Sequence, residues 1–567
     1  MDRNTILLLA LSAALYFGWQ ASLDYRFPNR HEIPVAAPPA SGASGVQAAG
    51  SPPAPGRADT RGVDSLPIVP ASREQLVVIE RPLYVATFTT AGGAVREWEL
   101  RDYDDASQPN RPAVTITTDR EQGSLNTPFL ELGAGDLSAL PYAVRKPNPD
   151  TIEFTAAVGP VRIKKIYRLE PNGYSATLAI EIENLGSSAV NPEFGVQWPA
   201  KRGLGADFEE YGLAAYASDE VTRFPVAPTP SALGFGGGSA TETEEIKPDP
   251  KASEPFELDW AGAETRYFLA ALMPDNPRDA RARMSPVVAE SEGLLEVWFE
   301  PVSLPPGAKL TREYRLYLGP KETERLDALG AHLDEAVQRG WVPWLTRRFT
   351  AMLTFVHDYV PNYGLAILLL TIVIRVAMAP LMVPQMRSMK RMAEVTPKVT
   401  AAQAAAKARY PDDPTKQQEA MMAVYKQEGV NPLAMFGGCL PMLLQMPIFV
   451  GFYSALQGSI HLRQQPFFGW MTDLSQPESL FMIPGVDLHI RALPLLLGGA
   501  MVLQQRLTPT PNMDPAQARM MQIVMPVMMT LMFYQFASGL GLYWLMSTLL
   551  GIGQQLLMNR TKKPVTA

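Results

Sequence analysis

The chain has few of the residues that form disulfides and metal sites. It contains one cysteine, Cys439, and five histidines in 567 residues. A single cysteine cannot form a disulfide within the chain, and the histidines lack the spacing of metal ligands. They are His31, His332, His357, His461 and His489. We therefore expect no disulfide, no metal and no other cofactor, and the soluble part of the chain must be held together by burial.

The motifs of common enzymes are also absent. The sequence has no Walker-type phosphate loop, no HExxH, no Gly-x-Ser-x-Gly turn and no pair of aspartates within an apolar run. Nothing therefore supports hydrolysis or energy coupling, and we do not expect an enzyme. The formal net charge of −7, without a basic strip interleaved with aromatics, argues against sequence-specific nucleic-acid binding.

Six apolar runs are present, and they predict a polytopic α-helical membrane protein. They are residues 5–23, 363–383, 433–456, 488–503, 521–536 and 540–557. A helix rises 1.5 Å per residue, so about 20 apolar residues cross a hydrocarbon core, and several of these runs are short. The first run follows Arg3 and ends without a small-residue cleavage site, which favours an uncleaved anchor over a signal peptide.

Basic residues predict which side of the membrane each connecting segment occupies. They lie between the second and third runs (Arg387, Lys390, Arg391 and Lys398 among others), between the fourth and fifth (Arg506 and Arg519), and in the tail (Arg560, Lys562 and Lys563). All three segments fall on the side of Arg3 if each run crosses once. We predict six spans, both termini in the cytoplasm and a large periplasmic domain in a bacterial inner membrane.

This pattern divides the chain into eight segments. They are an N-terminal anchor (1–24), a disordered periplasmic linker (25–70), a β-sandwich domain (71–320), linking and interfacial helices (321–361), span 2 (362–384), a cytoplasmic helical hairpin (385–430), spans 3–6 (431–558) and a short basic tail (559–567). The linker is rich in Ala, Pro, Gly and Ser and cannot bury enough apolar area to fold.

Period-two alternation and β-branched residues predict an all-β fold for the periplasmic domain. The strands are expected at residues 76–88, 151–157, 161–169, 174–182, 294–299 and 309–318, with a long loop at 233–254. Between residues 322 and 359 the period becomes helical, with Arg347 and Arg348 among aromatic side chains. This indicates a helix in the membrane interface, although its first half could instead dock on the β domain.

The cytoplasmic segment reads as two helices joined at residues 410–413. Asp413 can cap the second helix, with Pro414 at its first position. A thin apolar seam is expected from Met386, Met389, Met392, Met421, Met422 and Val424. A seam this thin predicts a mobile hairpin. Arg387, Lys390, Arg391 and Lys398 are its candidate contact residues.

Arg375 is the most informative single residue, because it lies inside the second apolar run. A guanidinium at the centre of a span costs about 2.5 to 3.5 kcal/mol on insertion scales, and no acidic residue in any run can neutralise it. Water or polar neighbours must offset that cost. The candidates are Thr371, Gln445, Tyr543, Ser547, Gly551 and Gln554. Snorkelling of Arg375, and ordinary interhelical hydrogen bonds for Gln445 and Ser547, remain the alternatives.

Methionine is abundant, with 26 in the chain. Its flexible thioether adapts to varied apolar partners, so a methionine-lined surface could receive many hydrophobic segments. Five methionines share one run: Met521, Met525, Met528, Met529 and Met532. Contact with lipid, or gap filling between helices, would explain them equally well.

Three motifs of the membrane part resemble the YidC/Oxa insertase family, and the periplasmic β domain resembles that of its Gram-negative branch. The motifs are GGCLPMLLQMPIF at 437–449, LRQQPF at 462–467 and SGLGLYW at 538–544, together with Arg375 in its span. The resemblance implies a five-helix insertase core and a β super-sandwich. It also implies a hydrophilic groove centred on Arg375, with Gln445 on its wall and substrate contacts at Phe449, Phe533 and Tyr543. Met525, Met528 and Met532 join these as candidate contacts.

The resemblance further implies partners: nascent membrane proteins, the Sec translocon, the signal recognition particle and its receptor, the ribosome and the lipid bilayer. Two rival functions are considered. One is an envelope-assembly protein whose β domain binds a carbohydrate or lipid precursor, although one span would suffice as its anchor. The other is a small-solute transporter, which would usually show internal repeats between its spans, and none is evident.

Overall fold

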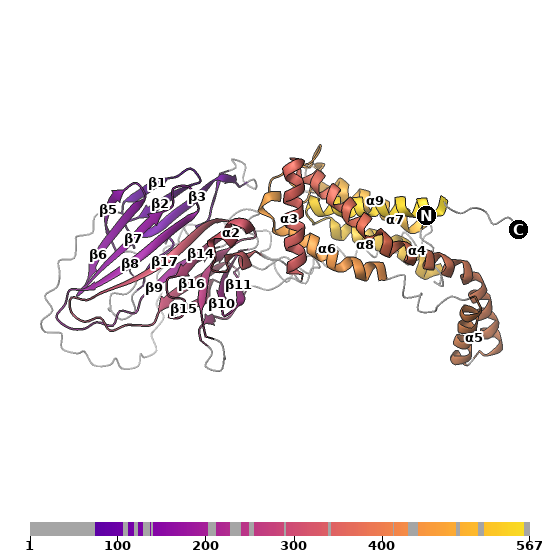
Figure 1. Cartoon of the computed structure of the whole chain (residues 1–567), viewed down its shortest axis with the longest axis horizontal. Coiled ribbons are helices and arrows are strands. Elements are labelled where there is room, and N and C mark those ends of the chain that lie inside the picture. The colour runs from indigo at the N-terminus through magenta and orange to yellow at the C-terminus, as the bar shows by residue number, and fades with distance from the viewer. Residues whose placement is uncertain are drawn as a thin grey trace, which may run out of the picture.

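The computed structural model describes residues 74–105, 112–117, 123–128, 137, 140–201, 211–226, 240–248, 255–288, 291–337, 342–411, 413–428, 440–483, 488–507 and 515–560. These form a β domain at one end of an elongated molecule and a helical bundle beside it (Figure 1). The predicted anchor (1–24), the linker (25–70) and residues 561–567 of the tail lie outside the described residues.

The β domain is built from strands β1 to β17. They are β1 (Leu76–Glu80), β2 (Tyr84–Thr89), β3 (Ala94–Asp104), β4 (Ala113–Thr115), β5 (Ala143–Asn148), β6 (Thr151–Val158), β7 (Val161–Leu169), β8 (Ser175–Asn184), β9 (Gly195–Lys201), β10 (Gly212–Ala217), β11 (Glu220–Pro225), β12 (Glu244–Ile246), β13 (Leu258–Glu264), β14 (Phe268–Pro274), β15 (Ala280–Val288), β16 (Glu292–Phe299) and β17 (Lys309–Pro320). Neighbouring strands pair antiparallel throughout these ranges.

One large sheet carries two smaller ones. It has nine strands in the order β11-β10-β13-β14-β17-β8-β7-β6-β5, and the smaller sheets are β1-β2-β3-β4 and β12-β15-β16-β9. Phe88 of β2 packs on Tyr167 of β7 with ring centroids 4.9 Å apart, which joins the first small sheet to the large one. Strands β9, β15 and β16 contact β13, which joins the second. A single apolar core therefore runs through all three sheets.

The strands confirm the alternation in the sequence, with two corrections. Predicted strands at 151–157, 161–169, 174–182, 294–299 and 309–318 correspond to β6, β7, β8, β16 and β17. The predicted strand at 76–88 is wrong as one element, because Arg81–Leu83 separates β1 from β2, and Pro82 cannot donate a ladder hydrogen bond. The loop at 233–254 is also wrong in part, since Glu244–Ile246 pairs with β15 as β12.

The two halves of the linking segment lie in different places. The helix α2 (Thr323–Leu329) and the 3₁₀ turn η2 (Leu333–Ala336) bury Leu326 and Leu333 in the β-domain core, so the docked alternative holds for the first half. The helix α3 (Pro343–Tyr359) runs across the end of the bundle (Figure 1). It packs on the bundle through Phe349 and Leu353. Its exposed side chains include Trp344, Phe355 and Tyr359, as an interfacial helix requires.

The bundle follows α3. Its elements are α4 (Tyr363–Arg409), α5 (Pro414–Gln427), α6 (Leu440–Gly458), η4 (Ile460–Leu462), the hairpin β18 (Phe481–Ile483) and β19 (Leu488–Ile490), α7 (Ala492–Leu507), α8 (Pro515–Phe533) and α9 (Ser538–Arg560). Among the described residues, one segment, Tyr363–Pro380, is both long and apolar enough for a span, and Gln522–Phe533 is a shorter apolar helix. Helix length and hydropathy in the described residues therefore do not test the prediction of six spans, which stays a prediction.

Two predicted boundaries differ from the structure. The predicted span 2 and the first arm of the predicted hairpin form one continuous helix, α4, which is 47 residues long and ends at Arg409. Proline removes one donor from a helix without stopping it when strong helix formers follow, and Ala, Lys, Arg and Met dominate the second half of α4. The run at 488–503 does not begin as a helix, because Leu488–Ile490 pairs with Phe481–Ile483 and α7 begins at Ala492.

The predicted hairpin forms at the end of the bundle opposite the β domain (Figure 1). The Asp413 carboxylate accepts a hydrogen bond from the Lys416 backbone at 3.2 Å, so the predicted cap is confirmed. The described seam contains Val395, Val399 and Tyr425. The prediction for Met422 is wrong, because its side chain is exposed and is not part of the seam. The side chains of Met386, Met389, Met392 and Met421 lie outside the described residues.

Candidate functional site

The Arg375 side chain points into the bundle, toward α9. Its Nε donates a hydrogen bond to the Ser547 hydroxyl at 2.8 Å, and one terminal nitrogen lies 3.8 Å from the sulfur of Met382. Arg375 is half-buried, and no carboxylate forms an ion pair with it in the described ranges. A buried cation without a counter-ion attracts water or a negatively charged ligand.

A second polar contact lies one helical turn away on α9. The Gln445 side chain on α6 donates a hydrogen bond to the Tyr543 hydroxyl at 2.9 Å. Because Tyr543 and Ser547 are four residues apart, they share one face of α9. That face of α9 therefore forms hydrogen bonds with both α4 and α6.

The other predicted polar residues lie along the same helices. Thr371, four residues before Arg375, is fully buried and donates its hydroxyl to the Ile367 carbonyl at 2.6 Å, so it bonds within α4. The amide nitrogen of Gln554 is buried and has no hydrogen-bond partner among the described residues. Gly551 lets α7 approach, because a Cβ there would lie 3.1 Å from the Gln504 amide. Gln504 was not predicted, since a glutamine near a helix end carries no distinctive signal.

The predicted substrate contacts surround a residue that the sequence did not single out, Trp544. The rings of Phe449 and Phe533 lie 4.7 and 5.1 Å from the Trp544 ring. Tyr543 packs on Phe452 at 4.5 Å. Phe533 and Tyr543 are almost fully buried, so a substrate reaches them only if the helices separate. The sequence signal for Trp544 was its place directly after Tyr543 in the SGLGLYW motif at 538–544.

The methionines of α8 divide between two faces. Met525 and Met528, one turn apart, are exposed, and Met528 exposes 56% of its surface. Met529 and Met532 pack against the bundle core. Gap filling therefore applies to Met529 and Met532, while the exposed Met525 and Met528 fit either a substrate surface or contact with lipid. The side chain of Met521 lies outside the described residues.

The loop at 459–480 covers the end of the bundle nearest the β domain. The backbone nitrogens of Ser538 and Gly539 donate to the carbonyls of Gln476 and Leu474 at 2.8 and 2.9 Å. The same loop reaches the β domain, where the side chains of Arg463 and Gln464 donate to the Asp104 carbonyl. The loop therefore contacts both the start of α9 and the β domain.

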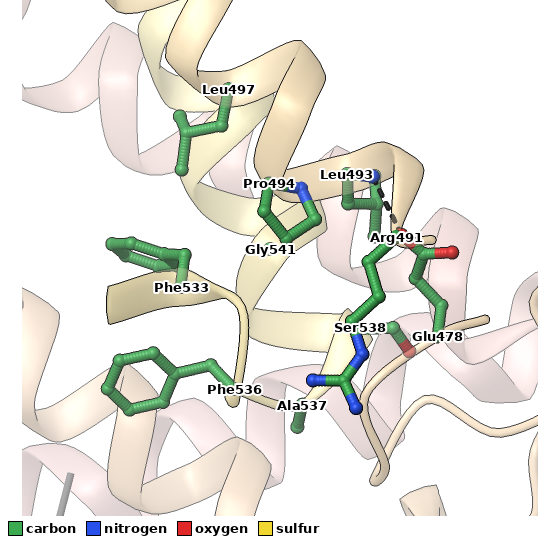
Figure 2. Close-up of a pocket in the computed structure, with 10 residues that line it drawn as sticks. All are labelled: Glu478, Arg491, Leu493, Pro494, Leu497, Phe533, Phe536, Ala537, Ser538 and Gly541. Carbon is green, nitrogen blue, oxygen red and sulfur yellow. Dashed lines mark hydrogen bonds between the residues drawn. The ribbon is translucent and has the colours of Figure 1, made fainter. Parts of the chain in front are cut away.

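Beneath this loop, two charged side chains, Glu478 and Arg491, lie close together near the start of α7 (Figure 2). Glu478 is buried and accepts from the Leu493 backbone at 2.7 Å and from the Trp470 indole at 2.6 Å. Arg491 donates to the Tyr534 carbonyl, and its guanidinium lies over the Tyr534 ring. A small cavity is lined by Glu478, Arg491, Leu493, Pro494, Leu497, Phe533, Phe536, Ala537, Ser538 and Gly541. Neither Glu478 nor Arg491 was predicted: Glu478 lies in a polar loop, and Arg491, although inside the run at 488–503, lies near its start and was not singled out.

The predicted cytoplasmic charges are only partly described. Arg391 is exposed, and Lys398 pairs with Glu428 at 2.6 Å across the hairpin. Arg387 and Lys390 lie on α4, but their side chains fall outside the described residues.

Comparison with known proteins identifies the family. Residues 76–352 match the family model described as the YidC periplasmic domain, and residues 355–565 match the 60Kd inner membrane protein model. A protein of Pelobacter propionicus named "Membrane protein insertase YidC" is 32% identical over 99% of this chain and 99% of its own length. The chain belongs to the YidC family of membrane protein insertases.

Other comparisons agree in name. A "Membrane protein insertase YidC" of Syntrophus aciditrophicus is 31% identical over 99% of this chain and its entire own length. A crystal structure titled "Active YidC insertase" is 17% identical, with a TM-score of 0.36, and covers 88% of this chain and 96% of that chain. The YidC relationship makes this chain an inner-membrane protein with a periplasmic β domain, and the family is one of insertases, not of enzymes.

Proposed function

We propose that this chain inserts and folds membrane proteins in the inner membrane by means of a hydrophilic groove centred on Arg375. The observation that carries the proposal is a half-buried guanidinium inside an apolar helix, bonded to Ser547 and without a carboxylate partner among the described residues. Gln445, Tyr543 and Ser547 supply hydrogen-bonding groups along the same path. Thr371 and Gln554 extend it toward the two ends.

The groove lowers a solvation barrier and needs no nucleotide or other cofactor. A polar or acidic segment that crosses a bilayer alone loses its water, which costs several kcal/mol per group. Arg375 and hydrated polar side chains replace part of that water halfway across. The loop at 459–480 keeps the path closed toward the periplasm, so the segment enters from the cytoplasm.

The apolar part of the substrate leaves the groove along α8 and α9. Met525 and Met528 offer an adaptable exposed surface there, with Met532 behind them. Phe449, Phe533 and Tyr543 contact the substrate once the helices around Trp544 separate. Passive partition into lipid then completes insertion.

The proposed topology has six spans, with both termini in the cytoplasm. It is supported by the position of the β domain and of α5 at opposite ends of the bundle (Figure 1). The hairpin, with Arg387, Lys390, Arg391 and Lys398, recruits substrates that arrive with ribosomes or with the signal recognition particle and its receptor. The Sec translocon is the partner for larger substrates.

The test is insertion by the purified protein. A small phage-coat-like protein is added to liposomes that contain only this chain, and protease protection measures the inserted fraction. The proposal expects protection well above that of empty liposomes. Absence of protection in a folded sample would instead favour the function in which the β domain binds a carbohydrate or lipid precursor.

A further inference from the structure

The hairpin β18–β19 exposes apolar side chains next to the helical bundle. Phe481 and Met482 expose 55% and 51% of their surfaces, and Leu480 and Phe468 are exposed as well. Phe481 pairs with Ile490 and Ile483 with Leu488, while Met482 pairs with His489, so two of the three pairs are apolar on both strands. In water such a ribbon would be costly, because each exposed aromatic or aliphatic side chain orders or displaces solvent.

Few charges lie near the hairpin. Between residues 479 and 490 the sequence has one carboxylate, Asp487, which lies outside the described residues, and one histidine, His489, which is half-buried and contacts the Ser479 hydroxyl at 2.9 Å. Of the flanking charges, Glu478 bonds the start of α7 (Figure 2), and Arg491 bonds the Tyr534 carbonyl just after α8. The exposed side chains of the described strands, Phe481 and Met482, are therefore apolar, which suits hydrocarbon better than a polar protein partner.

The apolar surface continues onto α7. Leu495 and Leu496, in the first turns of that helix, are also exposed. At 1.5 Å per residue they lie within about 10 Å of the end of β19 along the chain axis. Since the family is one of inner-membrane proteins, an exposed leucine face on a bundle helix is a lipid-facing surface. The hairpin is an extension of that surface at the β-domain end.

The base of the hairpin is fixed to two helices by polar contacts. The Tyr534 hydroxyl, just after α8, donates to the His489 carbonyl, while Arg491 donates to the Tyr534 carbonyl. Glu478 bonds the backbone of Leu493 in α7 at 2.7 Å. A hairpin held in lipid would thus hold α7 and the end of α8 at a fixed depth.

We propose that β18–β19 inserts into the periplasmic leaflet as a membrane anchor for the ends of α7 and α8. The occupant of its apolar surface is lipid. This inference does not depend on insertase activity, and its test measures depth, so the two can fail separately.

The test places a nitroxide on the hairpin. Cys439→Ser provides a cysteine-free chain, into which Phe481→Cys, Met482→Cys and the control Val287→Cys are introduced separately. Val287 is a matched control because it is an exposed apolar residue, 60% exposed, on the β domain. The labelled proteins are placed in nanodiscs of phosphatidylethanolamine and phosphatidylglycerol, where both faces are open to reagents.

Accessibility to oxygen and to a water-soluble nickel chelate gives the depth. The proposal expects positions 481 and 482 to have an oxygen-to-nickel accessibility ratio severalfold higher than position 287. Equal ratios at all three positions would place the hairpin in water and overturn it. Protection of 481 and 482 from both reagents, in nanodiscs and in detergent alike, would show that protein covers the hairpin and would also overturn it.

Discussion

The Nε atom of Arg375 lies 2.8 Å from the Ser547 hydroxyl oxygen, although 172 positions separate the two residues in the chain. The bond joins α4, which continues into the helical hairpin with α5, to α9, the last helix of the bundle. One turn before Ser547, Tyr543 accepts a hydrogen bond from Gln445 on α6. Two contacts on one face of α9 therefore hold the helices that surround the proposed groove.

The Gln445–Tyr543 contact should contribute a measurable pair energy. Tyr543→Phe and Gln445→Leu each remove one partner, and each is expected to lower the free energy of unfolding by about 0.5 to 1.5 kcal/mol. The double variant should lose less than the sum, with a coupling of about 0.6 kcal/mol. Unfolding of the purified protein in detergent measures this cycle. Strict additivity would show that the two side chains do not interact.

A pair of adjacent glycines on α7 offers a matched packing test. A Cβ on Gly498 would lie 2.2 Å from the Thr530 Oγ, which is itself bonded to the Pro526 carbonyl, whereas nothing lies within 4 Å of a Cβ on Gly499. Gly498→Ala should cost about 1 to 3 kcal/mol of stability. Gly499→Ala should be neutral or stabilising by up to about 1 kcal/mol.

The control for this packing contact is Thr530→Ala. Combined with Gly498→Ala, this change removes the clashing oxygen, so the double variant should regain most of the stability that Gly498→Ala loses. Thermal unfolding in detergent compares the parent, Gly498→Ala, Gly499→Ala and the double variant. If Gly499→Ala destabilises as much as Gly498→Ala, the close approach of α7 and α8 is contradicted.

The two faces of α8 should respond differently to polar substitution. Met528→Ser changes an exposed side chain and should reduce photocrosslinking of a nascent substrate severalfold while leaving thermal stability almost unchanged. Met529→Ser changes a side chain packed against the core and should cost about 1 to 3 kcal/mol of stability. Unchanged crosslinking with Met528→Ser would assign the exposed methionines to lipid contact alone.

Stability at the junction between the β domain and α3 should depend on pH through His332. A hydrogen bond with Asp259, 2.7 Å away, raises the pKa of His332 above its ordinary 6.5. A raised folded-state pKa gives stability that is complete below the unfolded pKa and is lost as pH rises through the folded one. The group is partly exposed, so the effect is small.

The titration of His332 can be followed directly. Histidine NMR signals, assigned with His332→Asn, should give a pKa above 6.5 in the parent chain and a lower pKa in Asp259→Asn. Thermal unfolding should show the parent losing its advantage over Asp259→Asn as pH increases from about 6. An identical pKa in both proteins would contradict the role of Asp259.

Sequence reasoning was most successful where local pattern decides the structure. The alternation at 161–169 corresponds residue for residue to β7, and Asp413 caps α5 as expected. It was less successful where distant contacts decide, since the strand β12 exists only because β15 pairs with it. The continuity of α4 through residue 384 likewise depends on the summed helix propensities of the residues that follow Pro384.

The same division applies to the candidate site. Arg375 is conspicuous because a charge in an apolar run is costly, and Ser547 follows from its spacing to Tyr543. Glu478 has no such signal, because a glutamate in a polar loop is ordinary, and Arg491 has a weaker one, because it lies only three residues from the start of the run at 488–503. Only the fold reveals that they bond the termini of α7 and α8.

The central claim is that the positive charge of Arg375 lowers the barrier for an acidic segment. The most direct measurement is the insertion rate into liposomes for the parent, Arg375→Lys and Arg375→Ala, each with a test protein bearing either an acidic or a neutral translocated tail. Because about 1.4 kcal/mol corresponds to tenfold in rate, we expect Arg375→Ala to slow the acidic substrate at least about tenfold and the neutral one less. Arg375→Lys should keep most of the activity. Equal losses with Ala and Lys, or for both tails, would contradict the account.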